Sequence, residues 1–264
     1  MKKFELTSET KINIFGKKLF RIKALISFAD VEAGETGGWV EKEGNVNQSG
    51  NAWVSGDAMV SGNAKVSGDA KVSGNAKVSG DAMVYGNAMV SGNAKVSGNA
   101  EVSGNAEVYG NAMVSGNAEV YGNAMVSGNA KVSGDAKVSG NAEVSGNAMV
   151  SGDAKVSGDA MVSGDAKVSG DAKVSGNAKV YGDAKVYGDA KVYGDADYTT
   201  IHGFGAQFRT TTFFRCKDKK VRVACGCFFG TIPEFREQVK NTRKGKIAEE
   251  YLMIADLMEK HFEK

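Results

Sequence analysis

Residues 51–68 read NAWVSGDAMVSGNAKVSG, and the repetition in this stretch decides the fold. Valine recurs every six residues from Val54 to Val192, which gives 24 uninterrupted copies of A-x-V-[SY]-G-[ND]. Six residues are three pleats of an extended strand, so the period fits strands and not a helix. Alanine and valine then point to one side, and x and Ser or Tyr to the other. Glycine followed by Asn or Asp turns the corner.

One hexapeptide has a single valine and a single alanine to bury, so the units must stack into coils. A small residue two positions before an aliphatic one resembles the hexapeptide repeat of left-handed parallel β-helices, which use three hexapeptides per 18-residue coil. The resemblance implies an all-β solenoid, a left-handed parallel β-helix of about 8 coils that is roughly 40 Å long. The alternative is a disordered low-complexity tract, which has no reason to hold valine and alanine in strict register.

Three domains are expected: an N-terminal β cap at 1–43, the β-helix at 44–197 and a small basic α+β domain at 198–264. Alternation of apolar residues around Gly16 predicts a hairpin in the cap. In the tail, 209–216 and 221–227 predict two strands about a Lys-Asp-Lys-Lys turn. Thr231-Ile232-Pro233-Glu234 is a capping box that predicts a helix start, and apolar spacing predicts a second helix over 247–262, giving a ββαα order.

The bulk composition indicates a protein of a reducing compartment. The net charge is only +2, but the tail from residue 198 carries 13 basic and 8 acidic residues. The three cysteines, Cys216, Cys225 and Cys227, all lie in this tail, and such an odd, clustered set predicts reduced thiols and not a disulfide framework. The sequence has no apolar run suited to a signal peptide or a membrane span, which predicts a cytoplasmic protein without membrane contact.

Stacking every 18 residues sorts the outward x residues into three columns. The column that begins at Trp53 alternates apolar and charged residues along its whole length. Methionine on an outward face suits adaptable contact surfaces. We therefore expect a homo-oligomer whose interface is formed by Trp53, Met89, Met125 and Met161; drift among tolerated residues is the alternative. Large aromatic residues near the open end of the core, Trp39 and Trp53, are also expected to act as plugs.

Catalysis is not expected. Hexapeptide-repeat β-helices include many acyltransferases, which use a histidine base and usually an extruded loop. This chain has no histidine before His202 and no insertion in its repeats, and serine without a base is an unactivated alcohol. Ice binding is disfavoured because the faces carry charged residues. No cofactor is expected, and no metal, since Cys216 and Cys225 should lie too far apart to share one with Cys227 and His202.

The basic hairpin of the tail is the expected binding site. Arginine combined with hydroxyl groups is what a phosphate site needs. The residues assigned to an anion or a partner are Arg209, Thr210, Thr211, Arg215 and Arg222. The grouping requires Arg222 to lie opposite Arg215 in the hairpin; a solvated hairpin face is the alternative.

The chain resembles hexapeptide-repeat proteins of phages and prophages in three segments taken together. These are GGWVEKEGN before the coil, the long VSGNA-type run, and RTTTFFRC with CGCFFGT and AEEYLMIAD. The resemblance implies a β-helix in the cytoplasm of an infected bacterium and transfers no catalytic residue. We expect a non-enzymatic scaffold that presents its basic C-terminal domain to a partner, either a host protein or a phosphate-containing ligand, with nucleic acid left open. The alternative is an anti-defence protein that sequesters a nucleotide signal or inhibits a host defence protein.

Overall fold

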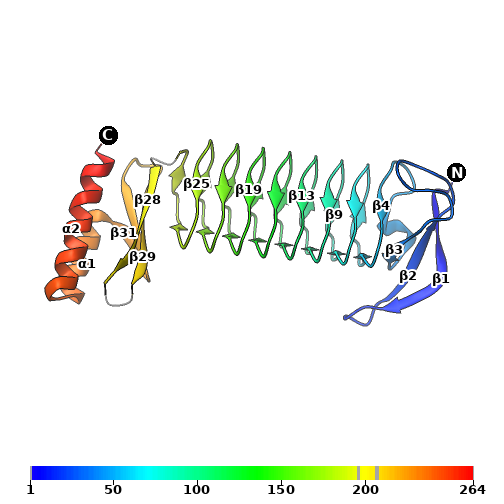
Figure 1. Cartoon of the computed structure of the whole chain (residues 1–264), viewed down its shortest axis with the longest axis horizontal. Coiled ribbons are helices and arrows are strands. Elements are labelled where there is room, and N and C mark those ends of the chain that lie inside the picture. The colour runs from blue at the N-terminus through cyan, green and yellow to red at the C-terminus, as the bar shows by residue number, and fades with distance from the viewer. Residues whose placement is uncertain (1, 195–196, 206–207, 264) are drawn as a thin grey trace.

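The computed structural model describes residues 2–194, 197–205 and 208–263 of the chain. Its centre is a straight rod of stacked coils, with an antiparallel hairpin at one end and a small sheet with two helices at the other (Figure 1). This arrangement confirms the expected parallel β-solenoid, its N-terminal β cap and its C-terminal α+β domain. None of the helices in these described ranges is both long and apolar enough to cross a membrane.

Each hexapeptide contributes one two-residue strand, and strands 18 residues apart pair in parallel to form three faces. The first face consists of β4 (Trp53–Val54), β7 (Lys71–Val72), β10 (Met89–Val90), β13 (Glu107–Val108), β16 (Met125–Val126), β19 (Glu143–Val144), β22 (Met161–Val162) and β25 (Lys179–Val180). The second face consists of β5 (Met59–Val60), β8 (Lys77–Val78), β11 (Lys95–Val96), β14 (Met113–Val114), β17 (Lys131–Val132), β20 (Met149–Val150), β23 (Lys167–Val168) and β26 (Lys185–Val186). The third face consists of β6 (Lys65–Val66), β9 (Met83–Val84), β12 (Glu101–Val102), β15 (Glu119–Val120), β18 (Lys137–Val138), β21 (Lys155–Val156), β24 (Lys173–Val174) and β27 (Lys191–Val192).

The interior of the rod consists of the repeat alanines and valines. Every one of them from Ala52 to Val192 is fully buried. Each valine stacks on the valines of the coils before and after it, as Val126 does on Val108 and Val144. The period-two alternation of the sequence is therefore confirmed, with x and Ser or Tyr on the outside.

The corners between stacked coils need glycine for two reasons, and Gly128 shows both. Its φ of +65° lies in the left-handed region, which disfavours residues with a Cβ. A Cβ built on it would lie 3.0 Å from the backbone nitrogen and oxygen of Gly146 in the next coil. The adjacent amide of Asn129 donates to the Gly146 carbonyl at 2.7 Å, so the corners are held in direct backbone contact.

Asparagine side chains at the corners form hydrogen-bonded ladders along the rod. Each Nδ2 donates to the Oδ1 of the residue one coil further on. The longest ladder runs through Asn75, Asn93, Asn111, Asn129 and Asn147 and ends on Asp165, with distances of 2.9–3.3 Å. A ladder ends at aspartate because a carboxylate accepts and has no proton to pass on.

The backbone bonds between coils have a direction. The N–H groups of x, Ser or Tyr, and Asn or Asp donate to carbonyls of the following coil; those of Met125 and Ser127 donate to Ala142 and Val144 at 2.9 Å. The N-terminal end of the rod consequently presents carbonyl oxygens without a preceding coil, and the C-terminal end presents N–H groups without a following one.

Side chains from both end domains satisfy some of these groups. At the N-terminal end, the buried Lys3 Nζ donates to the carbonyls of Gly50 (3.1 Å) and Ala52 (2.8 Å). At the C-terminal end, Thr212 Oγ1 accepts from the Lys185 amide at 3.0 Å. A donor thus covers one end and an acceptor the other, as the polarity of the rod requires.

The N-terminal cap is built on the second face. Its elements are β1 (Phe4–Ile12), β2 (Lys18–Ala24), β3 (Thr36–Val40) and the 3-10 turn η1 (Glu43–Asn45). β1 and β2 form the expected hairpin, and β3 pairs in parallel with β5. Val46 also bridges Val66 on the third face, so an irregular turn outside the repeat pattern precedes the eight regular coils.

The C-terminal domain contains two strands more than the sequence indicates. An antiparallel sheet of β28 (Tyr198–Phe204), β29 (Arg209–Arg215), β30 (Val221–Cys225) and β31 (Phe228–Thr231) is followed by α1 (Ile232–Thr242) and α2 (Gly245–Phe262). Thr231 and Glu234 form the expected capping box. One side of the sheet buries Phe214 against the last coil, and the other buries Phe213 against the helices.

Candidate functional site

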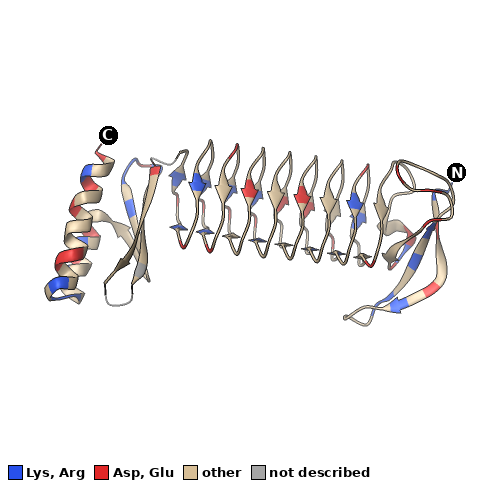
Figure 2. Cartoon of the chain, viewed as in Figure 1, with Lys and Arg blue, Asp and Glu red and all other residues tan. Residues whose placement is uncertain are grey.

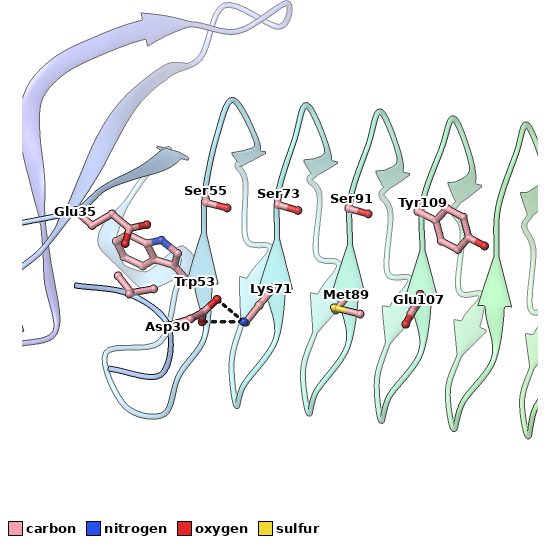
Figure 3. Close-up of a pocket in the computed structure, with 11 residues that line it drawn as sticks. Asp30, Glu35, Trp53, Ser55, Lys71, Ser73, Met89, Ser91, Glu107 and Tyr109 are labelled. Carbon is pink, nitrogen blue, oxygen red and sulfur yellow. Dashed lines mark hydrogen bonds and ion pairs between the residues drawn. The ribbon is translucent and has the colours of Figure 1, made fainter. Parts of the chain in front are cut away.

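A groove of about 560 Å³ lies on the first face, beside the N-terminal cap. Its floor is a row of serine hydroxyls from successive coils, Ser55, Ser73 and Ser91. The cap loop carrying Asp30 and Glu35 forms one end, and the half-exposed Tyr109 stands at the other (Figure 3).

Carboxylates dominate the charge of the groove. Lys71 Nζ contacts both oxygens of Asp30 at 2.8 Å, and this hydrogen bond lowers the pKa of the Asp30 carboxyl. Glu35 and Glu107 add two negative charges that no lysine or arginine of the described ranges neutralises. The described lining holds neither histidine nor cysteine. Its chemistry therefore suits binding of an elongated hydroxyl-rich or cationic ligand.

The expected columns of x residues exist, but the expected interface on the first face is altered. Trp53 is only 4 % exposed, because Phe4 and Phe28 of the cap pack edge-on against it at 6.2 and 5.5 Å. It acts as a plug and cannot belong to an outward interface. Met89, Met125 and Met161 remain outward and alternate with Glu107 and Glu143 (Figure 2), so they form separate apolar spots and no continuous stripe.

The five residues assigned to anion binding do not converge, which corrects the sequence-based grouping. Arg222 pairs with Phe214, and Arg215 pairs with Val221, so the two arginines lie on opposite sides of the sheet. Arg215 donates to the Phe262 carbonyl on the helix side at 2.8 Å. Arg222 on the rod side contacts Asp218 at 2.8 Å. The side chain of Arg209 lies outside the described part of the structure.

The two threonines of the grouping also separate. Thr211 is buried, and its hydroxyl donates to Cys225 Sγ at 3.2 Å. Thr210 points to the rod side, where its Oγ1 lies 2.9 Å from His202 Nδ1 and 3.4 Å from Asp183. His202 therefore has a neighbouring hydroxyl group, that of Thr210. The order of contacts differs from that of a hydrolase triad, however. The Asp183 carboxylate contacts the Thr210 hydroxyl and not the His202 imidazole, so it does not orient the base.

The cysteines differ in environment. Cys216 is buried, and burial together with Asp189 raises the pKa of its thiol to about 12. Cys225 is half-buried and Cys227 exposed. Within the described ranges, no three His, Cys, Asp or Glu side chains are grouped in a way that could hold a metal ion.

Sequence reasoning missed the groove and a second hollow under the hairpin. Both depend on cap segments that fold back over the repeat faces, and the alternation that predicts the hairpin does not show where its turn lies relative to those faces. The only indication was the run of apolar residues at the hairpin turn, Ile12, Ile14 and Phe15.

Comparison with known proteins concerns the rod alone. Residues 76–92, 82–98 and 118–134 match a family model described as the YdcK beta solenoid repeat. The rod is a repeat β-solenoid. These matches lie within the regular coils and include neither end domain. Among curated proteins, none matches the chain.

Proposed function

We propose that the chain is a non-enzymatic scaffold whose rigid solenoid holds two dissimilar end domains at a fixed separation. One observation carries this proposal: a single hydrophobic cluster runs without a break from Phe4 in the cap, through every repeat alanine and valine, to Phe214 and Ala224 in the C-terminal sheet. Among the described residues, this cluster joins both end domains to the rod through buried apolar contacts. Eight coils at about 4.8 Å per strand spacing place the end domains roughly 40 Å apart.

The placement of the candidate binding features supports this role. The groove lies at the N-terminal end, and the basic C-terminal domain lies at the other (Figure 1). Between them the rod repeats the same six-residue chemistry. A spacer or adaptor requires two different end domains on a rigid rod. Recognition concentrates on elements outside the regular framework, and here those elements are the two end domains.

A second candidate function is the sequestration of a phosphate-containing ligand, which would suit an anti-defence protein in a phage-infected bacterium. The second face favours it, because its outward column contains five lysines, three methionines and no acidic residue, beside a row of serine hydroxyls. Calorimetry with nucleotides at two salt concentrations tests this candidate, since contacts to phosphate weaken as salt rises.

The scaffold is tested by measuring the distance between its ends. Spin labels are attached at Glu5→Cys in the cap and Lys240→Cys in α1, in a chain whose Cys225 and Cys227 are changed to serine. We expect one narrow distance distribution. Deletion of residues 111–128, one whole coil, should shorten the distance by about 4.8 Å and keep its width. A broad distribution, or no shortening, would refute the rigid scaffold.

A further inference from the structure

The turn of the β1–β2 hairpin carries the most exposed group of apolar side chains in the described structure. Ile12, Ile14 and Phe15 are 73 %, 77 % and 73 % exposed. The hairpin projects obliquely from the side of the rod (Figure 1), and its turn overhangs the second face. Isolated apolar residues on a surface are ordinary, but three together at a projecting turn indicate a contact surface.

A hollow of about 160 Å³ lies between this turn and the second face. Ile14 and Phe15 line it from the hairpin turn, and Met59, Lys77 and Lys95 line it from the second face, which forms its floor. A cavity of about this size holds one benzene-sized group. The hollow therefore accommodates a single large apolar side chain.

The floor of the hollow is positively charged. Neither Lys77 nor Lys95 forms an ion pair within the described ranges, whereas the nearby acids Asp57 and Glu41 already face Lys11 and Lys17 at 3.9 and 3.0 Å. The hollow thus selects an apolar side chain that has carboxylates beside it.

The opposite end of the same molecule presents that combination. On α2, Met253 and Leu257 are 70 % and 58 % exposed and lie one turn apart on the outer side of the helix. Glu249 lies one turn before Met253, and Asp256 lies directly before Leu257. Glu249 has no ion-pair partner in the described ranges, while Asp256 also contacts Arg236 at 2.7 Å.

We propose that the chain self-associates end to end, with Leu257 of one copy inserted under the hairpin of the next. Glu249 and Asp256 of the first copy then face Lys77 and Lys95 of the second. Because the two surfaces differ and lie at opposite ends of a rod, the contact is heterologous and can repeat into a linear chain. A single inserted side chain makes a small interface, so association is weak and depends on concentration. It requires only the two surfaces and is independent of the scaffold role.

Sedimentation velocity of the full chain over a concentration series tests the proposal. Wild type should shift to larger species as concentration rises. Leu257→Lys and Phe15→Lys should each raise the dissociation constant at least about tenfold, the effect of losing the burial of one apolar side chain. Both changes are at exposed positions, and circular dichroism checks that the variants remain folded. Met125→Lys, an outward methionine on the first face, is the matched control and should leave association unchanged.

A charge exchange between copies gives the decisive result. Lys77→Glu with Lys95→Glu should abolish self-association, and so should Glu249→Lys in a separate preparation. Mixing the two preparations should restore pairing, since each then offers the complement of the other. A wild type that stays monomeric throughout the series overturns the proposal, as does loss of association in Met125→Lys but not in Leu257→Lys. Failure of the mixture to pair, or binding of anionic vesicles at the hairpin without self-association, also overturns it.

Discussion

Replacing Gly128 by alanine in the middle of the rod isolates the free energy of close contact between coils. Alanine at φ +65° costs about 1–2 kcal/mol through its Cβ. The Cβ would also lie 3.0 Å from the backbone of Gly146, and overpacking of this kind costs about 1–3 kcal/mol. The expected loss in free energy of unfolding is therefore about 2–5 kcal/mol.

Gly182 is the matched control because it lies in the same column of corners, 54 residues further on. Its φ is +64°, yet a Cβ there would meet nothing within 4 Å. Gly182→Ala should consequently lower the free energy of unfolding only by the cost of placing alanine at a positive φ, about 1–2 kcal/mol. The reduced entropy of the unfolded chain acts in both variants and cancels in their difference.

Urea unfolding followed by circular dichroism measures both variants. Hydrogen exchange of the Asn129 amide, which donates to Gly146 at 2.7 Å, adds a local measurement in case the array does not unfold as one unit. Equal destabilisation by the two substitutions, or a larger loss at Gly182, would refute the claim that backbone contact between coils fixes glycine at the corners.

Two further predictions concern ionisation at the two ends. Burial lowers the pKa of Lys3 to about 8 from 10.5, so the folded chain releases this proton first, and its stability should rise with pH between about 8 and 10.5. Lys3→Met should remove that rise, and a rise that persists would contradict the assignment. The pKa of Cys216 is raised to about 12 from 9.0, so its contribution to stability is complete below pH 9.0 and is lost as pH rises towards 12. At pH 8 an alkylating reagent should modify Cys227 well before Cys216, and equal rates would show that Cys216 is not protected.

The rod could be predicted from the sequence because every local preference agrees with the same structure. Glycine at each corner, alanine and valine at each inward position and a fixed period leave no competing arrangement. The same regularity could not reveal that Trp53 lies beneath Phe4 and Phe28, since the identity of an x residue does not show whether a cap covers it.

The C-terminal domain was predictable only in part. The helix that begins after Thr231 has an explicit capping box, whereas β31 runs directly into that helix and β28 contains Gly203 with a φ of +90°. Neither strand shows a clear alternation. The arginine grouping failed by one residue: the Cys216 amide donates to the Lys220 carbonyl and places Val221, not Arg222, opposite Arg215. A shift of one residue moves a side chain to the other side of the sheet.

Three hexapeptides per coil give the rod an angular phase as well as a length. Removing or adding 18 residues changes the length by one strand spacing and returns each face to its original direction. Removing six residues instead rotates the C-terminal domain by about a third of a turn relative to the hairpin and transfers each column of x residues to a neighbouring face. The number of whole coils thus sets the length of the rod, and the number of hexapeptides left over sets the orientation of one end domain relative to the other. A lineage that gains or loses whole coils changes the distance between the two end domains and keeps their relative orientation.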